Sequence, residues 1–256
     1  MRVLIKLGGT LLEAEGSRRR LAREISGARK EGAEIAVVHG GGKQLTAFLK
    51  ERGVESRFVN GLRVTSSEVL DSVIKVVAGS VNQYLVSAFI AEGAEAVGLT
   101  GADAMLTEAE PLNPDLGFVG KPVRSNGRLL RVLTAEGYLP VVACVAGDRN
   151  GALYNVNADQ MAVACAIGFG AERLFFFTDV EGVLDGEGRL CERLDEPACR
   201  RLIESGAATG GMQAKLEAAL TAVRGGVGEV LIAGGAREGL AEALLRGEQI
   251  GTTIAV

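Results

Sequence analysis

Several residue types that support common catalytic chemistry are scarce in this chain of 256 residues. Tryptophan is absent, aromatic residues make up only 4%, and there is a single histidine, His39. The four cysteines lie at positions 144, 165, 191 and 199 and form no CxxC pair. Because zinc and iron sites are commonly built from cysteine and histidine, we expect no such metal site. Cys144 and Cys165 lie in apolar runs and are interpreted as small buried residues.

Charge and hydrophobicity exclude further classes of protein. The net charge of −4 argues against a surface dedicated to nucleic acid. The chain starts with MRVLIKLGG, which is typical of a strand, so no secretory signal peptide is predicted. No segment reaches the run of about 18 uninterrupted apolar residues that a membrane span requires. We therefore expect a soluble cytoplasmic protein that binds neither nucleic acid nor membrane.

Glycine, by contrast, is abundant at 36 residues, and hydrophobic residues make up 47% of the chain. Short apolar runs alternate with segments of helical period. This alternation predicts an α/β protein with a mainly parallel open sheet sandwiched between helices. Strands are expected near residues 2–6, 34–38, 95–98, 139–144, 173–178, 228–232 and 251–255, and helices within 17–31, 43–52, 67–91, 157–168, 196–205, 212–224 and 238–246.

Two stretches interrupt this alternation. Residues 54–65 (VESRFVNGLRVT) and 117–132 (GFVGKPVRSNGRLLRV) predict β-hairpins. The second is expected to turn at Ser125-Asn126-Gly127. Hairpins added to an α/β sheet often act as lids or edges. A new strand is predicted to begin at Arg173, which indicates that the single domain consists of two lobes with a boundary near residue 170.

The commoner nucleotide-binding motifs are absent. In a Walker A loop, Gly-Lys is followed by Ser or Thr, but Gly42-Lys43 is followed by Gln44. The nearest candidate for a dinucleotide fingerprint, GFGAER, closes with Arg173 in place of glycine. Neither a kinase HRD motif nor a GxSxG motif occurs.

Two glycine loops and two lysines nevertheless indicate a phosphate site. Lys6 ends the first strand just before Gly8-Gly9, and Lys215 falls in the first turns of a helix behind Gly210-Gly211. Glycines let backbone N–H groups approach oxygen atoms closely, and a helix N-terminus adds partial positive charge. A lysine beside such amides provides a compact cation for phosphate.

Eight motifs carry a resemblance to a known family. Together they resemble the N-acetylglutamate kinases of the amino acid kinase family, over essentially the whole chain. HGGG, NGLRVT and NVNAD are the most specific, whereas KLGG and the TDVEGVL loop are shared across the wider family. In chain order the motifs are KLGGT (6–10), VVHGGGK (37–43), NGLRVT (60–65), VGLTGAD (97–103), YLPVV (138–142), YNVNADQ (154–160), TDVEGVL (178–184) and GGMQAKLEAAL (210–220).

The resemblance implies an ATP-dependent phosphotransferase. Such an enzyme moves the γ-phosphoryl group of ATP to the side-chain carboxylate of N-acetyl-L-glutamate, giving N-acetyl-L-glutamyl 5-phosphate and ADP, the second step of arginine biosynthesis. The cofactor implied is ATP with Mg²⁺ held mainly by the nucleotide phosphates, with no metal site in the protein. A carboxylate with a pKa near about 4.3 is ionised at neutral pH, so no general base is needed. Catalysis should rest on positioning and charge neutralisation.

The resemblance also implies roles for individual residues. Lys6 is expected to hold the transferring phosphoryl group from the acceptor side and Lys215 from the nucleotide side. Asp159 is expected to orient both lysines, with the N-cap of helix 157–168 as its alternative role. Arg63 should bind an acceptor carboxylate and Asn155 the amino acid end of that substrate. The remaining expected residues are Gly41 and Gly42 on the acceptor side and Gly8, Gly9, Asp179, Val180, Glu181, Gly182, Val183, Leu184, Ala207, Ala208, Thr209, Gly210 and Gly211 on the ATP side.

Some interpretations stay open. By resemblance, residues of about 1–170 form the acceptor-binding and dimerisation lobe and about 171–256 the ATP-binding lobe. Because the first strand begins at once, we expect a homodimer that arginine does not inhibit. His39 is expected to fix its loop by hydrogen bonds, and Lys43 either adds positive potential near the phosphate or faces solvent.

Two other functions remain as alternatives to N-acetylglutamate phosphorylation. They are a carrier-protein-linked aminoadipate or glutamate kinase of lysine biosynthesis, and a non-catalytic ligand-binding protein on the same fold.

Overall fold

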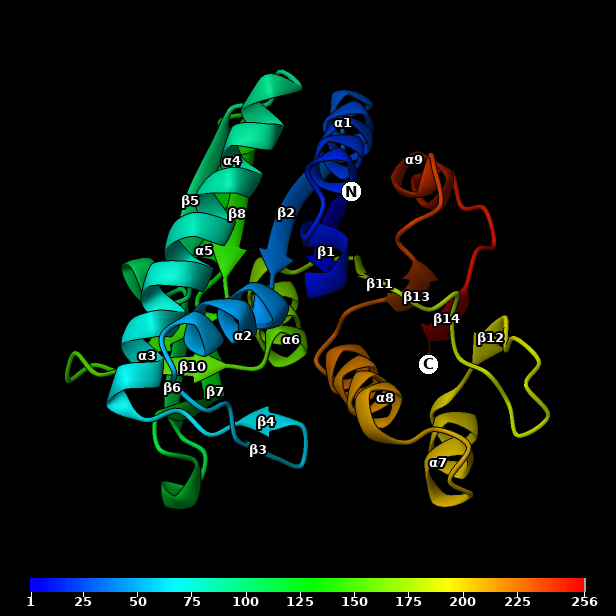
Figure 1. Ribbon diagram of the computed structural model, residues 1–256. Coiled ribbons are helices and arrows are strands. Elements are labelled where there is room, and N and C mark those ends of the chain that lie inside the picture. The colour runs from blue at the N-terminus through cyan, green and yellow to red at the C-terminus, as the bar shows by residue number, and fades with distance from the viewer. Residues whose placement is uncertain (256) are drawn as a thin grey trace.

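The apolar runs of the sequence form a central eight-stranded sheet in the computed structural model, which describes residues 1–255 (Figure 1). Neighbouring strands pair in parallel with one exception near the C-terminus, where the last two long strands are antiparallel. The predicted fold class is confirmed. In spatial order the strands are β5 (Ala96–Thr100), β8 (Leu139–Ala143), β2 (Glu34–His39), β1 (Arg2–Leu7), β11 (Arg173–Thr178), β13 (Glu229–Gly234), β14 (Thr252–Ala255) and β12 (Arg193–Leu194).

Strand β1 lies inside the sheet, between β2 and β11. Its Val3, Leu4 and Ile5 are fully buried because helices cover both faces of the sheet, which explains the continuous apolar run. Lys6 stands near the carboxyl end of β1, in register with Val38 of β2 and with β11 on the other side. Ligands of open α/β sheets bind beyond these carboxyl ends, so the topology itself directs Lys6 toward a site.

Helices cover the sheet as two contacting groups. In one group α1 packs against α4 and α9, and in the other α6 packs against α5 and α8. Every predicted helix and every predicted strand of the main sheet is present, with ends that differ from the expected ones by a few residues. The helices are α1 (Glu15–Lys30), α2 (Gly42–Glu51), α3 (Ser67–Val73), the π-helical segment η2 (Ile74–Val81), α4 (Asn82–Ala91), α5 (Arg128–Ala135), α6 (Ala158–Phe169), α7 (Glu196–Glu204), α8 (Gly210–Arg224) and α9 (Leu240–Leu245), with short 3₁₀ turns η1 (Gly9–Leu12), η3 (Asp103–Met105) and η4 (Pro114–Leu116).

The helix formed by α3, η2 and α4 is continuous, long and apolar. By length and composition it is the one helix among residues 1–255 that satisfies the criterion for a membrane span. It packs against α1, α2, β5 and β8. These contacts bury one face of the helix, and 44% of its most apolar window is buried.

The first predicted hairpin is confirmed, and the second is wrong. Strands β3 (Phe58–Val59) and β4 (Leu62–Arg63) form the first hairpin. Residues 128–132 belong to helix α5, because Asn126 Oδ1 accepts the N–H of Arg128 and Asn126-Gly127 turns the chain from a strand into a helix. The strand before that turn pairs with an upstream strand. The resulting four-stranded closed sheet contains β6 (Thr107–Pro111), β7 (Val119–Ser125), β9 (Val145–Gly147) and β10 (Leu153–Val156).

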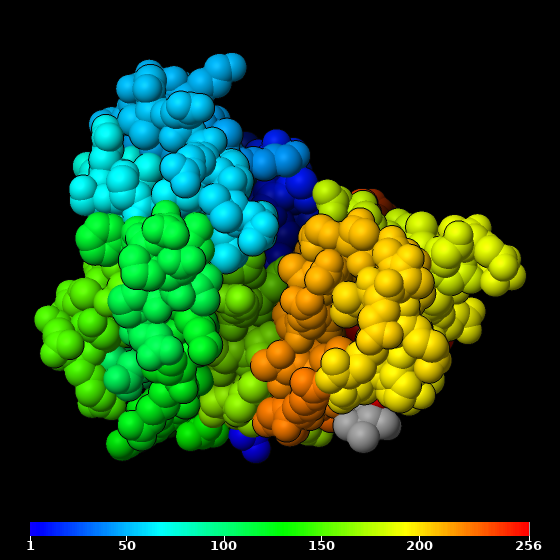
Figure 2. Space-filling model, turned by 90° about the horizontal axis from the view of Figure 1, so that it is seen from below, coloured from blue at the N-terminus to red at the C-terminus, as the bar shows by residue number. Residues whose placement is uncertain are grey.

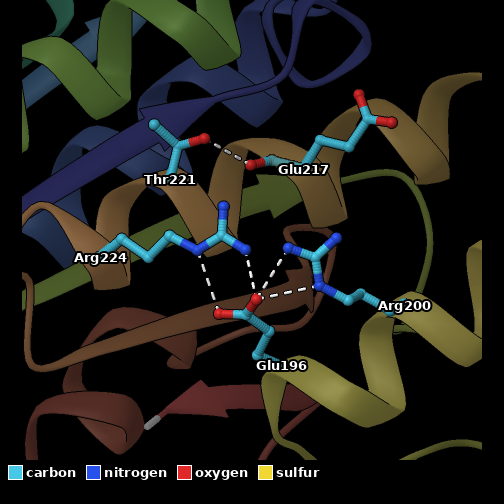
Figure 3. Close-up of polar contacts among 5 residues, drawn as sticks. All are labelled: Glu196, Arg200, Glu217, Thr221 and Arg224. Carbon is cyan, nitrogen blue, oxygen red and sulfur yellow. Dashed lines mark hydrogen bonds and ion pairs between the residues drawn. The ribbon is translucent and has the colours of Figure 1, made fainter.

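Helix α7 is tied to the far end of α8 by the carboxylate of Glu196 (Figure 3). Glu196 accepts hydrogen bonds from Arg224 of α8, with Nε at 3.0 Å, and from Arg200 of its own helix, with Nε at 2.9 Å. The hydrogen bonds from Arg224 contribute most, followed by those from Arg200, and together they lower the pKa of Glu196 to about 2. The carboxylate is therefore charged at neutral pH, and it joins α7 to the helix whose other end carries Lys215.

Candidate active site

Lys6, Asp159 and Lys215 form one cluster, although they come from three elements far apart in the sequence. Lys6 Nζ lies 2.6 Å from Asp159 Oδ1, and Lys215 Nζ lies 3.3 Å from Asp159 Oδ2. Lys6 is 7% exposed and Asp159 is 8% exposed. A buried carboxylate thus holds one ammonium group on each of its oxygens.

The charge state of this cluster follows from its contacts. Burial alone would raise the pKa of Asp159, but the charges and hydrogen bonds of Lys6 and Lys215 outweigh burial and hold the pKa below its usual value. Asp159 is therefore an anion at neutral pH and is unsuited to general acid catalysis. With two ammonium groups against one carboxylate, the cluster carries a net positive charge that attracts phosphate oxygens.

Local structure explains how Asp159 reaches the lysines. Asn157 caps helix α6, since its Oδ1 accepts the N–H of Asp159 at 2.9 Å and of Gln160 at 3.3 Å. Asp159 is therefore not the N-cap, and that alternative role is wrong. Its side chain lies in the first turn of α6 and is free to contact Lys6 and Lys215.

The two early glycine loops lie against each other beside this cluster. A Cβ atom on Gly9 would lie 3.6 Å from the nitrogen of Gly42 and 3.9 Å from that of Gly41. No acceptor within residues 1–255 takes the N–H groups of these three glycines. Gly8 differs, because its N–H donates to Phe177 O at 2.9 Å and ties the first loop to β11. The three free amides form a group of neighbouring donors suited to an anion.

Lys43, whose role was open, follows the second glycine loop. Its Nζ lies 2.8 Å from Glu13 Oε1, and both side chains are about half exposed. Exposed ion pairs contribute little to stability, so this contact links the two loops weakly.

His39 holds the second glycine loop from behind. It is fully buried, and its Nδ1 lies 2.7 Å from Gly40 O while Nε2 lies 3.0 Å from Asn82 Nδ2. The Asn82 amide also donates to Val141 O at 2.9 Å. Since an amide nitrogen is only a donor, the imidazole is assigned as neutral, with its proton on Nδ1. Burial accordingly lowers the pKa of His39 to about 4.

On the predicted acceptor side, Arg63 contacts the second glycine loop, whereas Asn155 contacts Thr65. Arg63 Nη2 donates to Thr46 Oγ1 at 2.7 Å and to Gly42 O at 3.2 Å, and Nη1 donates to Ser56. Burial lowers the pKa of Arg63, although a guanidinium remains charged at neutral pH. Asn155 Nδ2 donates to Thr65 Oγ1 at 3.0 Å.

On the predicted nucleotide side, residues 179–184 and 207–211 form two loops of the C-terminal half. Val183 N–H donates to Thr252 Oγ1 at 2.8 Å, and a Cβ on Gly182 would lie 2.7 Å from that oxygen. Gly210 has a φ of 53°, and Thr209 precedes α8 without a side-chain cap. Val180 and Leu184 are 41% and 48% exposed. The described side chains of these loops leave apolar surface and uncapped amides available to a ligand.

A cleft of about 830 Å³ lies beside Asp159 and Lys215. Figure 2 shows the surface of the N-terminal half and that of α8 on opposite sides of this groove. Asp159 and Lys215 line it, and so do Gly210 and Gly211 at the start of α8. The β3–β4 hairpin contributes Asn60, Gly61 and Leu62 to one wall. Residues 179–184 and 207–209 lie outside its lining, and so do Lys6, Arg63, Asn155 and the glycines at positions 8, 9, 41 and 42.

Sequence reasoning missed three residues that support the site. Asn157 caps α6, Asn82 contacts His39, and Thr65 contacts Asn155. Asn82 carried a usable signal, because it is a polar residue within a strongly apolar helix and buried polar groups need partners. Thr65 closes the NGLRVT motif and carried no separate signal.

Comparison with known proteins finds relatives that match most or nearly all of the chain. The sequence pattern of the amino acid kinase family matches residues 1–234. The chain is 58% identical over 252 residues to the acetylglutamate kinase of Solibacter usitatus (strain Ellin6076), covering 98% of each. It is 43% identical over 234 residues to the acetylglutamate kinase of Geobacillus stearothermophilus, covering 91% of this chain and 90% of that one.

A solved structure is similar as well. The N-acetylglutamate synthase of Neisseria gonorrhoeae, complexed with coenzyme A and N-acetyl-glutamate, matches with a TM-score of 0.88 and 25% identity. The match covers 100% of this chain and 59% of that chain. The present fold therefore corresponds to part of that longer protein.

The buried His39 predicts a specific pH dependence of stability. The unfolded chain binds a proton at an imidazole pKa of 6.5, whereas the folded protein binds it only near pH 4. Acidification from pH 6.5 to 4 therefore favours unfolding by up to roughly 3 kcal/mol through this residue. His39→Asn removes the contribution, and urea unfolding at pH 7 and at pH 4.5 measures it.

The native protein should lose more stability on acidification than H39N. The comparison is clean because the chain holds no second histidine and the carboxylates are common to both proteins. An equal loss in the two proteins would show that His39 is not buried in its neutral form.

Proposed function

This chain belongs to the amino acid kinase family, and on that basis we propose that it phosphorylates the side-chain carboxylate of N-acetyl-L-glutamate with ATP. The products are N-acetyl-L-glutamyl 5-phosphate and ADP, and the reaction is the second step of arginine biosynthesis. The observation that carries this proposal is the buried cluster in which Asp159 holds both Lys6 and Lys215. We place the reaction in the cytoplasm, where ATP is supplied.

The geometry supports a direct transfer. A carboxylate oxygen of the acceptor attacks the γ-phosphorus and forms the new P–O bond. The bond to the β–γ bridging oxygen breaks, and its electron pair leaves with ADP. The acceptor is already ionised, so no side chain has to remove a proton. The obstacle is repulsion between a carboxylate and a triphosphate, which the cluster and the free amides of Gly9, Gly41 and Gly42 are suited to reduce.

The ammonium groups act from two sides of the transferred group. We assign Lys6 to phosphoryl oxygens on the acceptor side and Lys215 to the β–γ bridge, where negative charge develops. Asp159 is a positioning residue that sets the separation of the two. Mg²⁺ bound with ATP supplies further positive charge to the phosphate oxygens. Among residues 1–255 no group of three His, Cys, Asp or Glu side chains is arranged to hold a metal ion.

We propose that the two lobes bind different substrates. We assign acceptor binding to residues of about 1–170, which include Arg63, Asn155, Gly41 and Gly42. We assign ATP binding to about 171–256, with residues 179–184 and 207–211, while Gly8 and Gly9 approach the phosphates from the first lobe. Gly8 contributes by anchoring its loop, since its own N–H is already bonded to Phe177 O.

We also propose a homodimer. The helix formed by α3, η2 and α4 leaves large apolar side chains in solvent, which is uncommon for an unpartnered helix. Tyr84 is 62% exposed and Ile90 is 56% exposed. A second copy of the chain on this face would cover them.

The choice of acceptor separates this proposal from its alternatives. With ATP and Mg²⁺, we expect N-acetyl-L-glutamate to release ADP and carrier-linked aminoadipate or glutamate to release none above background. We assign Arg63 to a free α-carboxylate, which a carrier-linked acceptor presents differently. A coupled ADP-release assay with both acceptors measures this. Release with the carrier-linked acceptor alone, or with neither, would overturn the proposal.

Lys215→Ala tests the assigned transfer role. Because Lys215 stabilises charge that develops during transfer, kcat should fall by roughly 10²–10³-fold, with a smaller rise in the KM of ATP. Steady-state kinetics with N-acetyl-L-glutamate measure both parameters. Lys50→Ala, which removes the same charge from an exposed position on α2, is the control and should stay near the native values. A nearly unchanged kcat in K215A would contradict the role.

A further inference from the structure

The hydroxyl of Thr65 joins two residues of the acceptor side. Thr65 is fully buried, and its Oγ1 donates to the backbone oxygen of Arg63 at 2.8 Å. The same oxygen accepts a hydrogen bond from Asn155 Nδ2 at 3.0 Å. Arg63 lies on the β3–β4 hairpin and Asn155 on β10, so this one atom bridges two separate elements.

The direction of these bonds is determined by chemistry. A hydroxyl has one proton, and the carbonyl of Arg63 can only accept, so Thr65 donates its proton there. Toward Asn155 the hydroxyl can then only accept, so the carboxamide must present its NH₂ group to Thr65. Asn155 Oδ1 consequently points away from Thr65. It has no hydrogen-bond partner within residues 1–255 and is left as an acceptor.

If Arg63 binds the α-carboxylate of the acceptor, as we propose above, a free acceptor atom on Asn155 selects for a particular ligand. N-acylation leaves one N–H group on the carbon that also carries the α-carboxylate. Arg63 is suited to that carboxylate, and Asn155 Oδ1 to that N–H. If the carboxamide were flipped, its NH₂ group would face the ligand's N–H, and two donors would oppose each other.

We propose that Thr65 is a positioning residue that orients Asn155 and thereby makes the site selective for an acceptor with an N–H donor beside its α-carboxylate. This inference rests on the proposed phosphorylation of N-acetyl-L-glutamate. It adds that selectivity for the acylated amino group depends on the hydroxyl of Thr65, which acts through Asn155 and does not itself contact the substrate.

The backbone around Thr65 does not depend on that hydroxyl. Thr65 N–H donates to Leu116 O at 2.9 Å, and Thr65 O accepts from Phe118 N at 2.7 Å. Gly117, with a φ of 64°, allows this close approach. Thr65→Val keeps these bonds and the side-chain shape and removes only the hydroxyl. Thr65→Ser keeps the hydroxyl and removes the methyl group.

Two acceptors that differ in a single donor provide the test. N-acetyl-L-glutamate carries the N–H group, whereas its oxygen analogue, L-2-acetoxyglutarate, replaces the N–H by an ester oxygen. We expect the native protein to prefer the amide by roughly 10- to 100-fold in kcat/KM, because the ester leaves Asn155 Oδ1 unpaired. T65V should reduce this preference to within a few-fold, mainly by raising the KM for the amide. T65S should retain it, and the KM of ATP should be unchanged in both variants.

Thr107→Val is a matched control, since Thr107 is also fully buried and its Oγ1 contacts only Cys165 Sγ, at 3.8 Å. It should leave the preference intact. If T65V does not fold by circular dichroism, Thr65→Ala removes the hydroxyl with less bulk and is interpreted in the same way. A native preference retained in the hydroxyl-free variant, or lost in T65S, overturns the inference. A native protein inactive with N-acetyl-L-glutamate overturns the proposed function instead, and the two failures are distinct because only the first occurs in an active enzyme.

Discussion

The carboxylate of Asp159 between two lysines is the interaction on which the rest of this structure depends. Two ammonium groups that share a buried site repel each other, and the anion between them makes their close approach tolerable. The three residues come from β1, α6 and α8, so the contact also fixes the relative positions of these elements. The arrangement favours phosphoryl transfer because the cluster carries a net positive charge and borders, through Lys215 and Asp159, a cleft that can receive an anion.

The surrounding layers hold the small donors beside this cluster. His39 and Asn82 support one glycine loop, and the bond from Gly8 to Phe177 O supports the other. The free amides of the two loops lie next to each other, with a Cβ on Gly9 reaching within 3.6 Å of the nitrogen of Gly42. Thr65 has the corresponding function on the substrate side. Each support is a buried polar group with its partners satisfied, which keeps the donors rigid before substrate arrives.

Much of this could be predicted from sequence, for physical reasons that differ between elements. The buried strands and amphipathic helices have clear periods, and their ends were placed within a few residues. The strand predicted for the segment RLLRV was wrong because a short apolar run fits a strand and a helix equally well. Here the hydrogen bond to Asn126 favours the start of a helix. The sequence motifs pointed to Lys6, Asp159 and Lys215 as site residues. That Asp159 contacts both lysines, that Asn157 caps α6 and that Thr65 bridges two elements could not be predicted. These features depend on contacts that a local sequence pattern does not contain.

The central claim is that this site transfers phosphate by positioning and charge neutralisation, without a side-chain base. The pH dependence of kcat with saturating N-acetyl-L-glutamate and Mg-ATP tests it most directly. The substrate carboxylate and Asp159 are both ionised well below neutrality, and the pKa of His39 is lowered to about 4. The profile should therefore be flat between about pH 6 and pH 8.5, a range that lies between the carboxylate and lysine pKa values. A rising limb of unit slope near neutral pH would reveal a catalytic base and contradict the account.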